Sequence, residues 1–181
     1  MATPSKGTLF TAGQDDHGRR LERILRKLFA QVPRSQINKA LRKGDIRVGG
    51  KRAKADFRVE AGDIIEVRAP FGREAQRPVE KGTVSQSAAG VPAISLEIVF
   101  RNNDLLALNK PPGHAVHGPE SLTGAVRSYL AGQVGDSLSF RPGPLHRLDK
   151  QTTGVIVYSL SLEGAKRFSA ALKEHALSKL Y

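Results

Sequence analysis

Apolar residues near the N-terminus recur with the spacing of one helix face. Four of them are spaced i, i+3, i+4, i+7, and arginine and lysine fill most of the positions between them. These four are Leu21, Ile24, Leu25 and Leu28. The pattern predicts an amphipathic helix. A second, shorter helical pattern covers residues 34–43, and Gly44 is placed to end it, because glycine readily takes the left-handed conformation at a helix C-terminus.

The next part of the chain alternates apolar and polar residues, as a half-buried strand does. Ile46 and Val48 flank Arg47, and Gly49-Gly50 follows, a dipeptide suited to the positive φ angles of a tight hairpin turn. A further strand is expected over residues 64–67. The predicted order is therefore helix, helix, hairpin and strand.

Composition changes between residues 70 and 93, where glycine, proline and serine are frequent and few residues are suited to burial. We interpret this stretch as a linker. The chain then divides into an N-terminal extension (1–18), a small domain of two helices and a small sheet (19–69), the linker (70–93) and a second domain (94–181).

The second domain mixes short strands with helices. Strands are expected over residues 96–100, 105–108 and 155–158, and helices are expected to begin after Ser121 and Ser161. The helix after Ser161 is expected to turn these residues inward: Leu162, Ala165, Phe168, Ser169 and Leu172. The strands look like members of a mostly antiparallel sheet, so the pattern predicts an α+β fold.

Basic residues outnumber acidic ones and are unevenly distributed. The 181 residues include 29 Lys and Arg against 17 Asp and Glu, a net charge of +12. Residues 1–79 carry 18 basic and 9 acidic side chains, a balance of +9, and the remainder carries 11 and 8, a balance of +3. Such an excess is typical of proteins that bind a polyanion. We therefore expect a nucleic-acid partner, bound mainly by the N-terminal half.

Side chains of the second predicted helix and the adjoining hairpin can converge on one basic face. The residues expected to contact RNA are Arg34, Ser35, Lys39, Arg42, Lys43, Arg47, Lys51 and Arg52. The alternative is a basic surface that is merely solvated. Few aromatic residues lie among these charges, which favours recognition of phosphates and shape in structured RNA over stacking on unpaired bases.

Asp149 is the first candidate for chemistry. It follows His146-Arg147-Leu148 and precedes a Thr-Thr-Gly turn and an apolar strand, which places it on a loop next to a rigid element, where reactive groups are commonly held. The alternative is an arginine–carboxylate pair that only fixes the loop.

Two ordered segments resemble the signatures of the RluA-type pseudouridine synthases. The first is His-Arg-Leu-Asp followed, after two residues, by Thr-Thr-Gly, with Thr153 where the family most often has serine. The second, residues 109–117, reads Asn-Lys-Pro-Pro-Gly-His-Ala-Val-His and matches the family's Asn-Lys-Pro-x-Gly-x-x-Val-His. The resemblance implies isomerisation of uridine to pseudouridine in RNA.

The family resemblance also implies roles for individual residues. Asp149 would act at the ribose, as a nucleophile or as a base. Arg147 would pair with that carboxylate, keep it ionised and take the place of the base extruded from its stack. The Lys-x-Tyr segment at the end of the chain implies that Tyr181 packs on the uracil and handles the C5 proton. His146 is expected to order the loop rather than react.

Residues 19–68 resemble the alpha-L RNA-binding motif, and the match over residues 32–63 suggests the large-subunit ribosomal RNA pseudouridine synthases of the C type. The implied substrate is large-subunit (23S) ribosomal RNA. The alternatives are a transfer RNA substrate, a non-catalytic RNA-binding or ribosome-associated module, and a glycosidase-like hydrolase. The last is disfavoured because that chemistry usually requires two carboxylates.

No cofactor or metal is expected, because the reaction rearranges one nucleoside and the chain has no nucleotide-binding or metal-binding signature. His114 and His117 have the spacing of two metal ligands, but no third ligand lies at a recognisable distance along the sequence. The chain has no cysteine and no apolar stretch long enough to span a bilayer. We expect a monomeric, cytoplasmic protein that does not contact membranes.

Catalytic domains of the resembled family continue past the tyrosine, with further strands and a later basic residue that contacts the aspartate. Tyr181 is the last residue here. We therefore expect a C-terminally incomplete catalytic domain, with unpaired strand edges and little or no isomerase activity.

Overall fold

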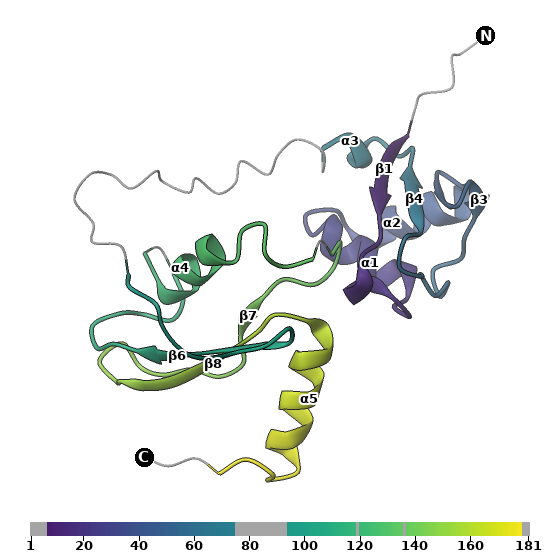
Figure 1. Cartoon of the computed structure of the whole chain (residues 1–181). Helices are drawn as coiled ribbons and strands as arrows, with labels where there is room; N and C mark the ends of the chain where they lie inside the picture. The colour runs from purple at the N-terminus through teal and green to yellow at the C-terminus, as the bar shows by residue number, and fades with distance from the viewer. Residues whose placement is uncertain (1–6, 75–93, 119, 136, 179–181) are drawn as a thin grey trace. The chain divides into compact units, whose positions relative to one another are not determined.

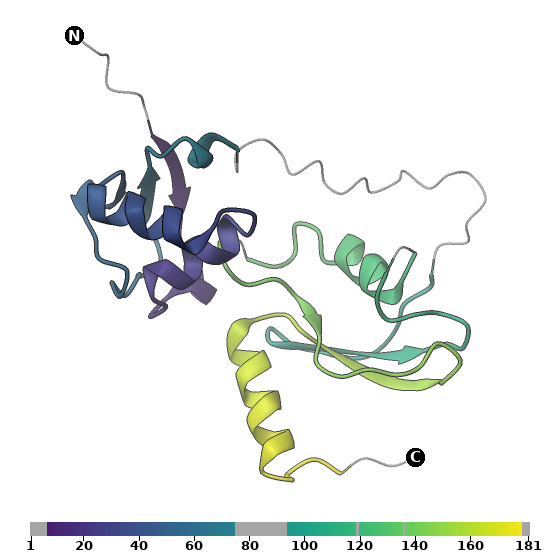
Figure 2. The ribbon, with the colours of Figure 1, turned by 180° about the vertical axis from the view of Figure 1, so that it is seen from behind.

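The computed structural model describes residues 7–74, 94–118, 120–135 and 137–178. Most of the expected linker therefore lies outside the described residues. By its contacts the chain forms two compact units, Met1–Gly90 with Gly135–Ser139, and Val91–Val134 with Phe140–Tyr181. Each unit has a sheet, helices and a hydrophobic core of its own (Figures 1 and 2). The predicted α+β class is confirmed.

The helices of the N-terminal unit follow the predicted pattern. The two predicted helices are α1 (Leu21–Leu28) and α2 (Arg34–Lys43). A short 3-10 helix that was not predicted, η1 (Gln14–Asp16), precedes them. The first three residues of the predicted α1 stripe are fully buried, as an amphipathic helix over a core requires. Gly44 ends α2 with a φ of 79°, in the left-handed region that favours glycine.

The sheet of this unit is antiparallel throughout. Its strands are β1 (Thr8–Thr11), β2 (Ile46–Val48), β3 (Lys51–Arg52) and β4 (Ile64–Val67). They lie in the order β1-β4-β2-β3. Gly49 and Gly50, with φ of 54° and 77°, form the turn between β2 and β3. The predicted hairpin is confirmed.

The N-terminal unit extends beyond residues 19–69 at both ends. Strand β1 lies in the segment expected to be an extension, and helix α3 (Phe71–Glu74) lies in the segment expected to be a linker. Contacts among three aromatic rings attach both β1 and α3 to this unit. Phe10 of β1 meets Phe29 edge-on at 5.7 Å between ring centroids, and Phe29 meets Phe71 in the same manner at 5.0 Å.

Asp16 is a fully buried carboxylate in the N-terminal unit. It accepts hydrogen bonds from the backbone N–H groups of Gly13, Leu138 and Ser139, and from the hydroxyl groups of Ser137 and Ser139. Burial alone would raise the pKa of Asp16, but these donors hold it below its ordinary value of 3.8. The carboxylate thus fixes a segment that is distant in sequence.

The C-terminal unit has a second antiparallel sheet, in the order β5-β6-β8-β7. Its strands and helices are β5 (Glu97–Arg101), β6 (Leu105–Lys110), α4 (Leu122–Tyr129), β7 (Gly143–Pro144), β8 (Gly154–Ser159) and α5 (Leu162–Lys173). The hydroxyl oxygens of Ser121 and Ser161 accept hydrogen bonds from Gly124 N and Gly164 N, and so cap α4 and α5. Both helices begin where the sequence predicted.

The core of this unit lies between the sheet and α4. Its centre is made of β6 and β8 residues, among them Leu106, Leu108, Ile156 and Tyr158, which are fully buried. The Tyr158 hydroxyl lies 3.1 Å from the hydroxyl of Thr123 on α4. In Figures 1 and 2, α4 and α5 lie on opposite sides of the sheet.

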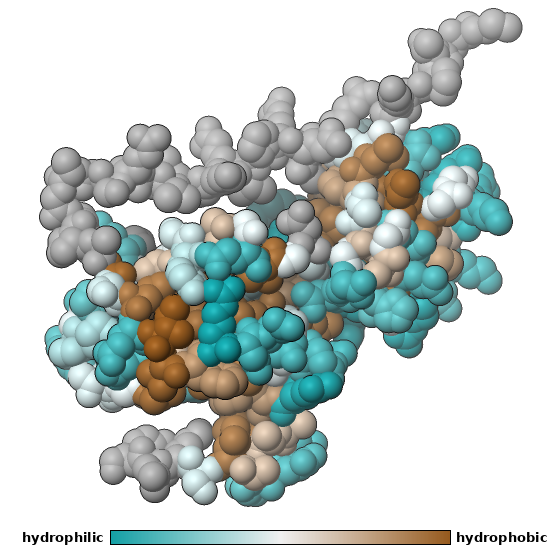
Figure 3. Space-filling model, in the orientation of Figure 1, coloured by the Kyte–Doolittle hydropathy of each residue, from teal (hydrophilic) through white to brown (hydrophobic). Residues whose placement is uncertain are grey.

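Burial in this unit differs between β5 and α5. All five residues of β5 are exposed, because β5 is an edge strand and a register shift between Ile98 and Phe100 interrupts the alternation. Figure 3 shows apolar side chains at the surface of this unit. In α5, four of the predicted inner residues, Leu162, Ala165, Phe168 and Leu172, are half-buried and Ser169 is exposed. Gly164 is buried, and a Cβ there would clash with the backbone of Asp104.

We predict that Asp16→Asn lowers the free energy of unfolding by about 2–3 kcal/mol, because an amide cannot accept all the hydrogen bonds that the carboxylate accepts. The pKa of Asp16 is lowered in the folded state, so its contribution is fully present above the unfolded-state pKa near 3.8 and is lost as pH falls through the folded-state value. Urea denaturation between pH 2 and pH 7 measures both effects. The exposed Asp56→Asn is the control; equal stability of the two variants would contradict the assignment.

Candidate active site and nucleic-acid interface

Asp149 lies on the loop that joins β7 to β8, residues 145–153, in which no residue belongs to a helix or strand. We call this segment the Asp149 loop. The side chains of Arg147 and Asp149 are exposed, whereas Leu148 between them is half-buried and packs against the core of the unit. The loop is therefore anchored by an apolar residue while it presents two charged groups to solvent.

The start of the Asp149 loop is bound to strand β8. Leu145 N donates to the carbonyl oxygen of Val157 at 2.8 Å, and Val157 N donates to Nε2 of His146 at 3.1 Å. The His146 ring also stacks on Phe168 of α5, with 6.2 Å between centroids and 14° between the ring planes. As expected, His146 orders the loop.

The end of the Asp149 loop is held by Lys110, the last residue of β6. Its Nζ donates hydrogen bonds to the carbonyl oxygens of Pro111 at 3.0 Å, Lys150 at 3.0 Å and Thr152 at 2.7 Å. Thr152 N in turn donates to the Asp149 carbonyl oxygen at 3.1 Å, which closes a turn directly after the carboxylate. Two of the three carbonyl groups on Lys110 belong to the loop, so this one side chain fixes its course.

Lys110 is fully buried, which is unusual for a lysine. An ammonium group has three N–H donors, and each has a carbonyl acceptor here. Burial lowers the pKa of Lys110, and the negative charge of Asp149 acts in the opposite direction. The hydrogen bonds and the Asp149 charge both favour the protonated form, so the loop and the lysine stabilise each other.

The expected ion pair between Arg147 and Asp149 is not formed within the described part of the chain. An exposed pair gains little in water and restricts two side chains, so nothing holds this pair together. The cation that interacts electrostatically with Asp149 is Lys110. The loop is thus fixed by a buried cation below it, and the Arg147 guanidinium is left exposed.

Lys110 is not among the site residues predicted from the sequence, although a signal was present. Lys110 follows the apolar run Leu105–Leu108 and lies in the Asn-Lys-Pro segment that carried the family resemblance. A lysine at the end of a central strand, next to prolines that lack N–H donors, is placed where its ammonium group can bind loop carbonyls. Hydrophobic pattern alone counts lysine as a surface residue.

The other candidate site residues of the C-terminal unit are Tyr181, His114 and His117. Tyr181 lies outside the described residues. His114 Nδ1 lies 3.0 Å from the carbonyl oxygen of Pro112, and His117 is exposed. Across the described ranges, no group of three His, Cys, Asp or Glu residues is close enough to hold a metal ion. No helix in those ranges is both long and apolar enough to cross a bilayer.

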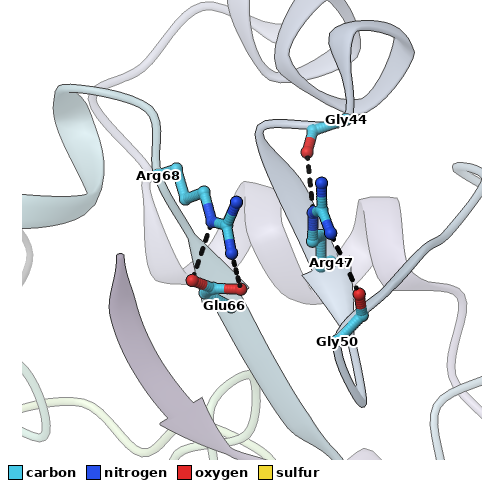
Figure 4. Close-up of polar contacts among 5 residues, drawn as sticks. All are labelled: Gly44, Arg47, Gly50, Glu66 and Arg68. Atoms are coloured by element: carbon cyan, nitrogen blue, oxygen red, sulfur yellow. Dashed lines mark hydrogen bonds and ion pairs between the residues drawn. The ribbon is translucent and has the colours of Figure 1, made fainter. Parts of the chain in front are cut away.

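Three of the eight predicted RNA contacts already have partners in the N-terminal unit. Arg34 Nε donates to Glu22 at 2.5 Å, and Arg52 Nη2 donates to the Lys43 carbonyl oxygen at 3.2 Å. Arg47 donates to the carbonyl oxygens of Gly44 at 3.4 Å and Gly50 at 3.2 Å, as Figure 4 shows. Arg47 and Arg52 thus bind carbonyl groups at the C-terminal end of α2, where the helix dipole attracts a positive charge.

The remaining five predicted contacts are exposed and make no side-chain hydrogen bond or ion pair with described residues. They are Ser35, Lys39, Arg42, Lys43 and Lys51. Beside them, Arg68 binds both carboxylate oxygens of Glu66, at 2.8 and 3.0 Å (Figure 4). The bond from Arg68 lowers the pKa of Glu66, which keeps this acidic group ionised and paired. The free basic groups are the ones available to phosphates.

We predict that Lys110→Met destabilises the C-terminal unit by about 2–4 kcal/mol, because three carbonyl groups lose the donor that the buried ammonium group supplies. The exposed Lys150→Met, which leaves those hydrogen bonds intact, should change stability by less than about 0.5 kcal/mol. Urea denaturation followed by circular dichroism compares the two. A Lys110→Met variant as stable as Lys150→Met would contradict the role assigned to the buried ammonium group.

Two family models match the chain. Residues 19–65 match the S4 domain, and residues 104–181 match the RNA pseudouridylate synthase family. The first range contains α1, α2 and the basic face, and the second contains Lys110 and the Asp149 loop.

Curated relatives cover most of this chain. "Ribosomal large subunit pseudouridine synthase C" of Salmonella typhimurium is 35% identical over 184 residues, which is 99% of this chain and 54% of the relative. The protein of the same name from Escherichia coli is 36% identical over 172 residues, 92% of this chain and 50% of the relative. That from Vibrio cholerae is 32% identical and is covered to 52%. The chain spans about half the length of these relatives.

Among solved structures, "Human RNA Pseudouridylate Synthase Domain Containing 1" aligns over 46% of this chain and 30% of its own, with 23% identity and a TM-score of 0.38. The family matches and the curated relatives agree with the two signatures in the sequence. Residues 19–65 are thus similar to the S4 domain family and residues 104–181 to the RNA pseudouridylate synthase family.

Proposed function

We propose that this chain acts in the isomerisation of specific uridines to pseudouridine in large-subunit ribosomal RNA, with Asp149 as the catalytic carboxylate. The observation that carries the proposal is an exposed carboxylate on a loop whose two ends are fixed, by His146 and by Lys110. Such a group is accessible to a nucleotide and still restrained, as catalysis requires.

The reaction breaks the N1–C1′ bond of a uridine and joins C5 of the uracil to the ribose. Because the product is an isomer, the chemistry needs no redox partner and no group donor. In this proposal Asp149 acts at the ribose as nucleophile or base, and Arg147 takes the place of the extruded base. Tyr181 packs on the uracil and handles the C5 proton. The exposed Arg147 side chain supports its part, because it forms no ion pair with any residue in the described ranges.

The basic face of α2 and the adjoining hairpin is proposed to bind the RNA. On this face Lys39, Arg42, Lys43 and Lys51 are exposed cations without an ion pair to described residues, and Ser35 adds a hydroxyl group. Helix α2 and the hairpin are rigidly connected by Arg47 and Arg52, which favours recognition of structured RNA by its phosphates. We further propose that the protein works as a monomer in the cytoplasm, away from membranes.

Replacing Asp149 with Asn tests the catalytic assignment. The purified chain, alone and extended by the C-terminal half of the Escherichia coli relative, is incubated with ribosomal and transfer RNA transcripts, and pseudouridine is measured by mass spectrometry. We expect the extended form to modify large-subunit RNA, and Asp149→Asn to abolish modification without weakening RNA binding. Modification that survives Asp149→Asn would refute the assignment, and modification of transfer RNA alone would favour the alternative substrate.

If the basic face binds RNA, removing three positive charges from α2 should weaken RNA binding more than removing three positive charges from α5. Replacing Lys39, Arg42 and Lys43 by Gln should weaken binding to a structured ribosomal RNA fragment and reduce the slope of log K against log salt by about one unit for each phosphate that is no longer neutralised. The same change at Lys166, Arg167 and Lys173 of α5 removes equal charge elsewhere and is the control. Equal weakening by both sets, measured by filter binding at several salt concentrations, would contradict a defined basic face.

A further inference from the structure

His146 lies at the point where strand β7 separates from β8. Gly143 and Pro144 pair with Ser159 and Tyr158 in antiparallel register. If the pairing continued, Leu145 would lie opposite Val157 and the two residues would exchange two backbone hydrogen bonds. Only one of these is formed, from Leu145 N to the Val157 carbonyl oxygen at 2.8 Å.

The second hydrogen bond of that pair is made by a side chain. Val157 N donates to His146 Nε2 at 3.1 Å, so the imidazole nitrogen replaces the Leu145 carbonyl oxygen as the acceptor. An unpaired backbone N–H in the sheet would be costly. Because the ring supplies the acceptor, the chain can leave the sheet at residue 146 without that cost, and Arg147 and Asp149 follow in an exposed segment.

The ring is held in one orientation by a second contact. It stacks nearly parallel to Phe168 of α5, with 6.2 Å between centroids. The amide of Val157 fixes the edge of the imidazole, and Phe168 fixes its face. A side chain restrained in two directions transmits its position to the backbone that carries it, one residue before Arg147.

A ring nitrogen that accepts a hydrogen bond carries no proton. We propose that His146 is a positioning residue, an uncharged imidazole with its proton on Nδ1, which substitutes for a strand acceptor and thereby sets the direction in which Arg147 and Asp149 leave the sheet. The importance of this direction for catalysis rests on the function proposed above. The proton on Nδ1 of His146 and the hydrogen bond from Val157 N do not depend on that function. His146 does not exchange protons with the substrate through Nε2, because that nitrogen is bound to Val157.

The tautomer is measured directly in this chain by nitrogen-15 NMR of the histidine rings near neutral pH, with the His146 signals assigned by their absence in His146→Gln. The expected result is a protonated Nδ1 and an unprotonated Nε2 that is coupled to the Val157 amide. A protonated Nε2 would overturn the proposal, whether or not the chain isomerises uridine.

Two variants of His146 distinguish the effect of the hydrogen-bond acceptor from the effect of the aromatic ring. His146→Phe keeps an aromatic ring against Phe168 but has no acceptor, whereas His146→Gln places an amide oxygen near the position of Nε2. Amide hydrogen exchange of Val157 should become about tenfold faster in His146→Phe and stay close to the wild-type rate in His146→Gln. The exposed His17→Phe is the control. An unchanged exchange rate in His146→Phe would overturn the proposal.

The effect on chemistry is measured in the extended protein described above. We expect His146→Phe to lower kcat about tenfold with little change in KM, since the loop is displaced but the RNA-binding face is intact, and His146→Gln to recover most of the loss. An unchanged kcat in His146→Phe would show that the hydrogen bond does not position the reacting groups. If no form is active, the function proposed above fails, while the two NMR measurements still decide the role of His146.

Discussion

The buried ammonium group of Lys110 is the interaction on which the geometry of the Asp149 loop depends. It binds three carbonyl oxygens, two of them in the loop, and has no exposed surface. A lysine in such a place is stable only because each N–H donor has an acceptor and an acidic group lies close by. The chain can therefore expose Asp149 on a segment outside any helix or strand and still restrain it. His146 fixes the other end of the segment with one hydrogen bond and one ring contact.

In the N-terminal unit, some basic side chains bind other protein groups and others are exposed to a ligand. Arg47 and Arg52 bind the C-terminal end of α2, Arg34 binds Glu22, and Arg68 binds Glu66. The contacts of Arg47 and Arg52 connect the hairpin to the end of α2. The lysines and the arginine that remain free lie on the same elements, so an RNA backbone would meet a rigid array of cations. One part of the positive charge thus stabilises the fold and another part is available to bind RNA. Composition alone does not show which residues belong to which part.

Much of this arrangement was predictable because it is local in sequence. The spacing of the leucines defined α1, Gly44 ended α2, and Gly49-Gly50 formed the hairpin turn, each through conformational preferences of a few neighbouring residues. Most contacts of Asp16 were not predictable, since Ser137, Leu138 and Ser139 lie 121 to 123 residues away. The burial of Lys110 was missed because periodicity treats lysine as polar. The exposure of all five β5 residues is not predictable from the sequence, because a register shift at an edge strand leaves no mark in the alternation.

The most direct test of the account is a map of pseudouridines in ribosomal RNA from cells that lack the gene and from cells whose gene encodes Asp149→Asn. If the Asp149 carboxylate acts on uridines of large-subunit RNA, both strains should lose the same pseudouridines there and retain the others. Maps identical to that of wild-type cells, in either strain, would contradict the central claim.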